Sequence, residues 1–200
     1  MVIVTINEEI KQKLKQNNFS TLFLNNCHNS KFLSIHEINS KIVGVGCVGG
    51  LMNHYAIELK DEYYGRGLWR NIFNEIHTES QNRNMSFLTG VYKTTNLISI
   101  KIQTSLGFTP IFSIDYNKVE GREVVIILPF NSKGKLIKKI MKIFDTKIGN
   151  MLFSLFFILS KPILKNIIGL SSKTMSKIDL KYSLYNFEKV KAVMEKINLN

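Results

Sequence analysis

Ile57-Glu58-Leu59-Lys60-Asp61-Glu62-Tyr63-Tyr64-Gly65-Arg66-Gly67-Leu68 is the stretch that decides the fold of this 200-residue chain. The apolar residues that lead into it, from His54 to Leu59, predict a β-strand. Apolar residues at helical spacing follow the two glycines and predict a helix that begins near Leu68. Glycines let the backbone approach a ligand closely, and the N-terminus of a helix attracts anions such as phosphate. A tight connection without a ligand is the alternative interpretation of this turn.

Strand-like and helix-like patterns alternate on both sides of this turn and predict an α/β or α+β domain. The predicted elements are strand 2–6, helix 7–16 with Asn7 as its cap, hairpin strands 32–38 and 42–48, strand 54–59, the helix from Leu68, strand 86–92, helix 96–106, and hairpin strands 111–116 and 124–128.

A second motif lies in the helix predicted at 96–106. Asn96 and Ser99 open the helix with the spacing Asn-x-x-Ser, and Gly107 follows its last residue as a C-terminal cap. Ile98 and Ile102 lie on one face of this helix.

The two motifs, in this order and on these elements, make residues 1–131 resemble the GNAT superfamily of acyl-CoA-dependent N-acyltransferases. The glycine turn is similar to the pyrophosphate loop of that superfamily, Arg/Gln-x-x-Gly-x-Gly/Ala, and the Asn-x-x-Ser helix is similar to its Asn-x-x-Ala/Ser helix. The resemblance implies an α/β fold with a mixed central sheet flanked by helices. It also implies acetyl-CoA, or another acyl-CoA, as co-substrate, a primary amine as acceptor, and no metal.

The resemblance also implies roles for individual residues. Glu58 is the candidate general base, directly or through water, and His54 is the second candidate; Tyr92 and Gln103 are the candidates near the leaving thiolate, with Ser99 as a substitute donor. The cofactor-binding residues that it implies are Leu59, Tyr64, Gly65, Arg66, Gly67, Leu68, Trp69, Asn96 and Ser99.

Three positions depart from the family pattern. Tyr64 stands where the loop has Arg or Gln, Trp69 stands where it has a small residue, and Gln103 stands where many members have a proton-donating Tyr. An amide is no useful general acid, although it can hydrogen-bond to sulfur or a carbonyl. A non-catalytic GNAT-fold module that binds a membrane surface or a protein partner is therefore the alternative function.

The net charge divides the chain into two parts. The 27 basic and 15 acidic residues give +12, and residues 131–200 account for +10 of it, with 14 lysines, no arginine and four acidic residues. We therefore predict a nearly neutral acyltransferase-like domain over 1–131 and a basic helical extension over 132–200.

The extension has a helical apolar stripe between residues 133 and 160 with lysines beside it. The stripe comprises Ile137, Ile140, Met141, Phe144, Ile148, Met151, Leu152, Leu155, Phe156 and Leu159. An in-plane helix on an anionic membrane explains both the stripe and the lysines. Packing on the domain or in a homodimer explains the stripe alone, and the lack of arginine makes nucleic acid an unlikely partner.

The cysteines and histidines of the chain bear on its cellular compartment and on metal binding. Cys27 and Cys47 lack the spacing of a zinc or redox site, which predicts reduced thiols and a cytoplasmic protein. The histidines show no ligand-like spacing, so no metal is expected. If the extension binds a membrane, the protein is peripheral at its inner face, where a carrier-linked amino-sugar is an acceptor to consider beside small-molecule amines and proteins.

Overall fold

The structure is a computed structural model that describes residues 2–93, 95–116, 121–149, 151, 152, 155 and 159. These residues form two compact units, of which the first ends at Leu88 and the second begins at Thr89. Seven strands form one sheet in the order β1-β2-β3-β4-β5-β7-β6, with helices packed on it, as the sequence predicted. The stripe residue Phe156 lies outside the described residues.

The first unit contains four antiparallel strands and three α-helices. Its elements are β1 Val2–Val4, α1 Glu8–Gln16, α2 Thr21–His28, β2 Ser30–Ile38, β3 Lys41–Gly49, β4 His54–Leu59, the 3-10 turn η1 Asp61–Tyr63, and α3 Leu68–Asn82. Strand β4 has the predicted bounds, and Asn7 caps α1 by accepting a hydrogen bond from the N–H of Ile10 at 2.8 Å.

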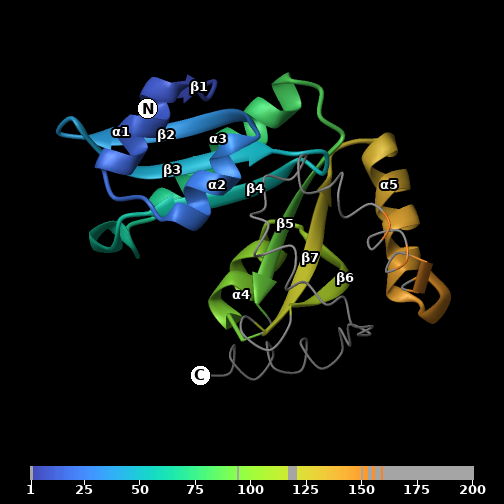
Figure 1. The fold of residues 1–200 in the computed structure, drawn as a ribbon. Coiled ribbons are helices and arrows are strands. Elements are labelled where there is room, and N and C mark those ends of the chain that lie inside the picture. The colour runs from blue at the N-terminus through green and yellow to red at the C-terminus, as the bar shows by residue number, and fades with distance from the viewer. Residues whose placement is uncertain are drawn as a thin grey trace. The chain divides into compact units, whose positions relative to one another are not determined.

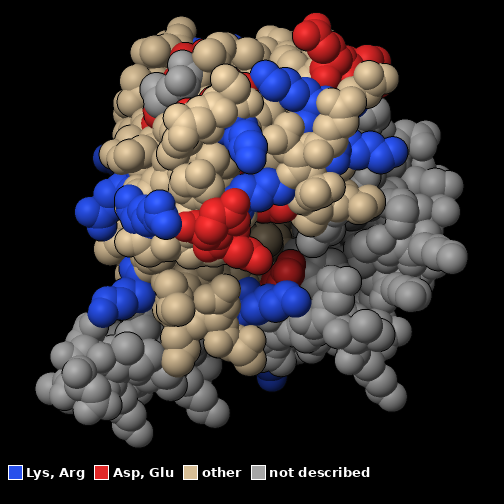
Figure 2. Space-filling view, turned by 90° about the vertical axis from the view of Figure 1, so that its left-hand side faces the viewer, with Lys and Arg blue, Asp and Glu red and all other residues tan. Residues whose placement is uncertain are grey.

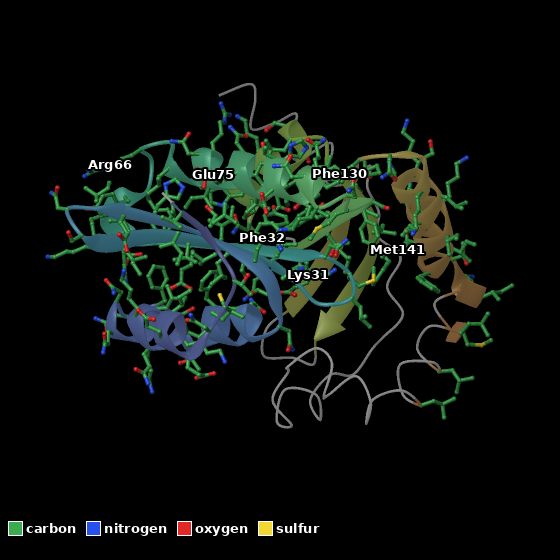
Figure 3. All side chains as sticks on the ribbon, turned by 90° about the horizontal axis from the view of Figure 1, so that it is seen from above. Lys31, Phe32, Arg66, Glu75, Phe130 and Met141 are labelled. Carbon is green, nitrogen blue, oxygen red and sulfur yellow. The ribbon has the colours of Figure 1, made fainter. Side chains whose placement is uncertain are left out.

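Helices cover both faces of this part of the sheet: α1 and α2 lie on one face and α3 on the other (Figures 1 and 3). On β3, Val45 and Cys47 belong to the core under α1 and α2. Gly46 faces α3, where a Cβ atom would come within 2.6 Å of side-chain atoms of Ile72 and Ile76. Since both faces are covered, β3 is buried from Ile42 to Gly49.

Helix α2 was not predicted from the sequence. Ser20 caps it by accepting a hydrogen bond from the N–H of Phe23 at 3.2 Å. Phe19, Phe23 and Cys27 recur at steps of four residues and enter the core. The cap and this spacing were the signals that could have revealed the helix.

Among its described residues, the second unit has three strands, the α-helices α4 and α5, and further helical residues from 147 onward. Its elements are β5 Phe87–Lys93, which begins in the last two residues of the first unit, α4 Leu97–Ser105, β6 Thr109–Tyr116, β7 Gly121–Pro129, α5 Ser132–Lys142, and the 3-10 turn η2 Ile143–Asp145. Strands β6 and β7 pair as the predicted hairpin. On α4, the face that contains Ile98 is turned to solvent, with Ile98 75% exposed, while Ile100 and Gln103 are buried.

Helix α5 lies at the start of the predicted extension. Asn131 caps it, and the helix contacts β6 and β7. Met141, labelled in Figure 3, is buried, and the ring of Phe144 meets that of Phe112 edge-on with centroids 6.1 Å apart. The described residues from 147 to 159 are also helical. No helix of the described residues is long and apolar enough to cross a membrane.

Candidate functional site

Strand β4 places both candidate bases on the same face of the sheet. Glu58 pairs with Val45 and His54 pairs with Gly49, so both side chains face the layer of α1 and α2. Four residues of strand separate them by about 13 Å. Glu58 and His54 therefore lie too far apart to act on the same proton.

The carboxylate of Glu58 is held by Ser20, the N-cap residue of α2. The backbone N–H of Ser20 donates to Oε1 at 2.8 Å, and the hydroxyl of Ser20 donates to Oε2 at 2.6 Å. The same hydroxyl accepts the capping hydrogen bond from Phe23. Ser20 thus fixes the orientation of Glu58 and the start of α2 together, and sequence reasoning missed it because it missed the helix.

Other polar groups lie around Glu58. The negative charge of Glu58 is one cause, after burial and Asp61, of the raised pKa of Tyr64. Lys60, two residues beyond Glu58, places its ammonium 4.4 Å from the centre of the Phe19 ring. Both oxygens of Glu58 have remaining lone pairs, so the carboxylate can still accept a proton from a substrate.

His54 is neutral near pH 7. Burial lowers the pKa of His54 to about 4, because the surroundings disfavour the charged form. A neutral imidazole can accept a proton, but a pKa this low makes it a weak base at neutral pH.

The turn from Tyr64 to Trp69 has the backbone form of an anion site. Gly65 and Gly67 have φ values of +76° and +75°, and a Cβ atom at either would meet nothing within 4 Å. In the described part of the chain, the N–H groups of residues 65–69 donate to no recorded acceptor. Successive free N–H groups beside left-handed residues at a helix start bind phosphate oxygens. The backbone therefore fits a pyrophosphate.

Two side chains of the turn have defined positions. Arg66 is exposed at the edge of the unit, with its guanidinium carbon 5.3 Å from the centre of the Tyr63 ring (Figure 3). The indole of Trp69 stacks parallel on Phe73, with centroids 5.5 Å apart. The packing of Trp69 along α3 lets the turn keep its open backbone although a small residue is missing there.

The second unit holds the other predicted site residues. Asn96 caps α4, its Oδ1 accepting from the N–H of Ser99 at 3.0 Å, so both residues form the start of this helix. Gln103, one turn further along α4 from Ser99, is 7% exposed, and its Oε1 has no hydrogen-bond partner among the described residues. Tyr92 is buried on β5. Gln103 therefore has a free acceptor in place of the hydroxyl that many GNAT members have.

Leu59 is buried beneath α3, over Gly44, so only its backbone is available to a cofactor. No cluster of three or more potential metal-ligating side chains occurs among the residues that the structure describes. On the face shown in Figure 2, Lys and Arg side chains lie among Asp and Glu side chains, without a large field of one sign.

Comparison with solved structures identifies the fold. The ribosomal-protein-S18-alanine N-acetyltransferase of Escherichia coli matches with a TM-score of 0.53 and 17% identity over 64% of this chain and 92% of that chain. Arabidopsis thaliana Naa50, solved with the bisubstrate analogue CoA-Ac-MVNAL, matches with 0.52 and 16% over 64% and 98%. An IAA acetyltransferase of Bacillus cereus matches with 0.52 and 15% over 64% and 99%. No protein-family model and no curated protein matches the chain. The chain thus has the GNAT fold.

Proposed function

We propose that this protein is an N-acyltransferase that moves an acyl group, most simply acetyl, from acetyl-CoA to a primary amine. The single observation that supports this most strongly is the arrangement of Glu58 and the turn 64–69. A carboxylate lies near the end of β4, and the open glycine backbone follows it within one short turn. The GNAT fold of the chain agrees with this function.

Each residue of the proposed site would have its own role in the transfer. The thioester supplies an activated acyl group when the co-substrate is bound. The backbone N–H groups of residues 65–69 hold its pyrophosphate, and the Arg66 guanidinium adds a positive charge. Glu58 takes a proton from the acceptor ammonium, so that the amine nitrogen has a lone pair for attack on the carbonyl carbon. The amide N–H of Gln103 is the group that we assign to hydrogen-bond the leaving sulfur or the carbonyl, and Tyr92 and Ser99 carry the hydroxyls that we assign to protonate the sulfur.

The acceptor class is part of the proposal. The E. coli and Arabidopsis proteins with this fold are described by their action on a ribosomal protein and by a peptide-like bisubstrate analogue. A peptide N-terminus is therefore the first acceptor to test. An amino-sugar on a nucleotide or lipid carrier is the second, and small-molecule amines are the third.

One observation favours a second candidate function, a non-catalytic module. Both oxygens of Glu58 accept hydrogen bonds from Ser20, as a purely structural carboxylate at a helix start would. In that case the protein binds a partner or a surface, and the retained fold serves only as a scaffold.

Two measurements test the proposed function. Calorimetric titration of the full chain with acetyl-CoA tests the pyrophosphate site, and release of free CoA thiol over a panel of peptides, amino-sugars and polyamines tests transfer. Micromolar binding with turnover of at least one amine supports the enzyme. No binding at millimolar acetyl-CoA would overturn it, and binding without turnover across the panel would favour the module.

A further inference from the structure

Helix α5 has two apolar faces, although one face is enough to attach it to the fold. Gly134 and Met141 are buried against the β6–β7 hairpin, and Phe144 packs edge-on against Phe112. The residues 136, 140 and 143 are equally apolar but are 57%, 50% and 55% exposed. Of the stripe predicted from the sequence, Met141 and Phe144 are therefore packed, whereas Ile140 lies on an open face with Leu136 and Ile143, which the predicted stripe did not include.

The open residues form a continuous strip. At about 100° per residue, Leu136, Ile140 and Ile143 fall within about 60° of one another, on the side opposite Gly134 and Met141. We call Leu136, Ile140 and Ile143 the outer strip. The described residues of the next turns continue to expose large apolar side chains, namely Ile148, Met151, Leu152, Leu155 and Leu159, each more than half exposed.

Lysines occupy the sector between the packed face and the outer strip. By the same helical geometry, Lys135, Lys138, Lys139 and Lys142 lie side by side along one flank of the strip. Among the described residues, none of the four forms an ion pair with a carboxylate. Burial and the adjacent charge of Lys142 lower the pKa of Lys138. These lysines therefore stand close together without a neutralising partner in the described part of the chain.

We propose that the outer strip and its flanking lysines bind the surface of an anionic lipid bilayer, with α5 lying in the plane of the interface. An apolar strip inserts among acyl chains, while lysines on its flank reach the phosphate groups of the lipids. The short open strip suits binding on a membrane rather than across it, in agreement with the absence of a spanning helix among the described residues.

The charges disfavour the other occupants of the strip. A symmetric dimer with antiparallel α5 helices would bring the two rows of lysines together, and a dimer with parallel helices would leave both rows without a partner of opposite charge. The 40 residues after Ser160 contain eight lysines and three acidic residues, so the net charge of this tail has the same sign as the lysines that flank the outer strip. Nucleic acid would satisfy the lysines but leave the apolar residues in water, and residues 131–200 contain no arginine for base or phosphate contacts.

The test is sedimentation of the full chain with vesicles of phosphatidylglycerol and phosphatidylcholine, compared with vesicles of phosphatidylcholine alone. We expect binding to the anionic vesicles only, and release when salt is raised from about 0.1 M to about 1 M, because the Debye length falls from about 10 Å to about 3 Å. Equal binding to both kinds of vesicle, or binding to neither, would overturn the proposal.

Two variants and one control locate the surface. Leu136→Ser with Ile140→Ser should weaken partitioning by roughly tenfold or more, because two half-exposed aliphatic side chains no longer insert. Lys135→Gln with Lys139→Gln should weaken it by about 25-fold on anionic vesicles, since each lysine contributes about fivefold near such a surface. Leu51→Ser removes a leucine of the β3–β4 turn that is 70% exposed, more than Leu136, and should change nothing.

Circular dichroism and thermal melting establish that each variant is folded, and the lysine pair keeps the test valid if the serine pair unfolds. Sedimentation velocity without lipid addresses the competing occupant. A wild-type dimer that the Leu136→Ser, Ile140→Ser variant converts to a monomer, without vesicle binding by either form, would overturn the proposal, as would tight RNA binding without vesicle binding.

Discussion

Replacement of Glu58 by glutamine separates a catalytic carboxylate from a structural one. The glutamine side chain has the same shape, so its carbonyl oxygen can accept from the Ser20 N–H and its amide nitrogen can donate to the Ser20 hydroxyl, which also has acceptor lone pairs. The start of α2 therefore keeps its contacts. The ability to take up a proton is lost, and the bonds to Ser20 are kept but weakened.

A catalytic role and a structural role of Glu58 predict effects of different size on turnover and on stability. Loss of a general base lowers turnover by about 10² to 10⁴-fold. The change from a charged to a neutral acceptor weakens the bonds to Ser20 and costs about 1 kcal/mol of unfolding free energy. Ser20→Ala should cost a similar amount of stability, about 1 kcal/mol, because it removes the helix cap, but it leaves the backbone N–H to orient Glu58. We expect this second variant to retain turnover within about tenfold, with reduced stability.

Steady-state release of CoA thiol with the best acceptor measures turnover, calorimetry measures acetyl-CoA affinity, and urea unfolding measures stability. Glu37→Gln is the matched control, because Glu37 is a strand glutamate whose partner is the surface residue Lys13 at 2.7 Å. Unchanged turnover of the Glu58→Gln variant beside a clear loss of stability would refute the assignment of Glu58 as base and favour the non-catalytic module.

Three further predictions concern the first unit. Gly46→Ala places a methyl group against two isoleucine side chains of α3 and should cost about 1–3 kcal/mol, a fall in Tm of roughly 3–10 °C in a thermal melt, whereas an unchanged Tm would mean that α3 can move away. The low pKa of His54, about 4 against an unfolded value near 6.5, means that its contribution to stability is complete above pH 6.5 and declines as pH falls toward 4. The upper limit of that decline is about 3 kcal/mol, and His54→Gln should remove this part of the pH dependence in urea unfolding; identical slopes for both proteins would contradict burial of the imidazole. Cys27 and Cys47 are buried free thiols, and the adjacent Cys47 thiol, burial and the Glu58 charge raise the pKa of Cys27. Neither should react with a disulfide reagent until urea unfolds the chain, and fast labelling of the native protein would show that this core opens.

The sequence predicted the strands more completely than the helices of the first unit. Strands β2, β3 and β4 are long apolar runs bounded by turn residues, and such runs are visible locally. Helix α2 is only eight residues long, with Asn25 and Asn26 in its middle, so its periodicity is weak. Its position depends on burial of Phe23 and Cys27 under the sheet, which is a tertiary effect.

The sequence predicted the backbone of the candidate site but not the contacts between its side chains. The left-handed glycines of the 64–69 turn follow from the local sequence, since only glycine adopts that conformation without strain. The bond between Ser20 and Glu58 joins residues 38 positions apart and depends on the pairing of β4. The stacking of Trp69 on Phe73 is local in sequence, but its direction along α3 required the structure.

Helix α5 shows why a periodic pattern alone does not assign a partner. Both of its apolar faces repeat at steps of three and four, so the sequence merges Met141 and Ile140 into one stripe. Only the position of the β6–β7 hairpin shows that Met141 is buried and Ile140 is exposed. Packing on β6 and β7 thus accounts for half of the apolar residues and for none of the unpaired lysines. What remains is an apolar strip with lysines along its flank, and those two features are the ones that an anionic lipid surface satisfies together.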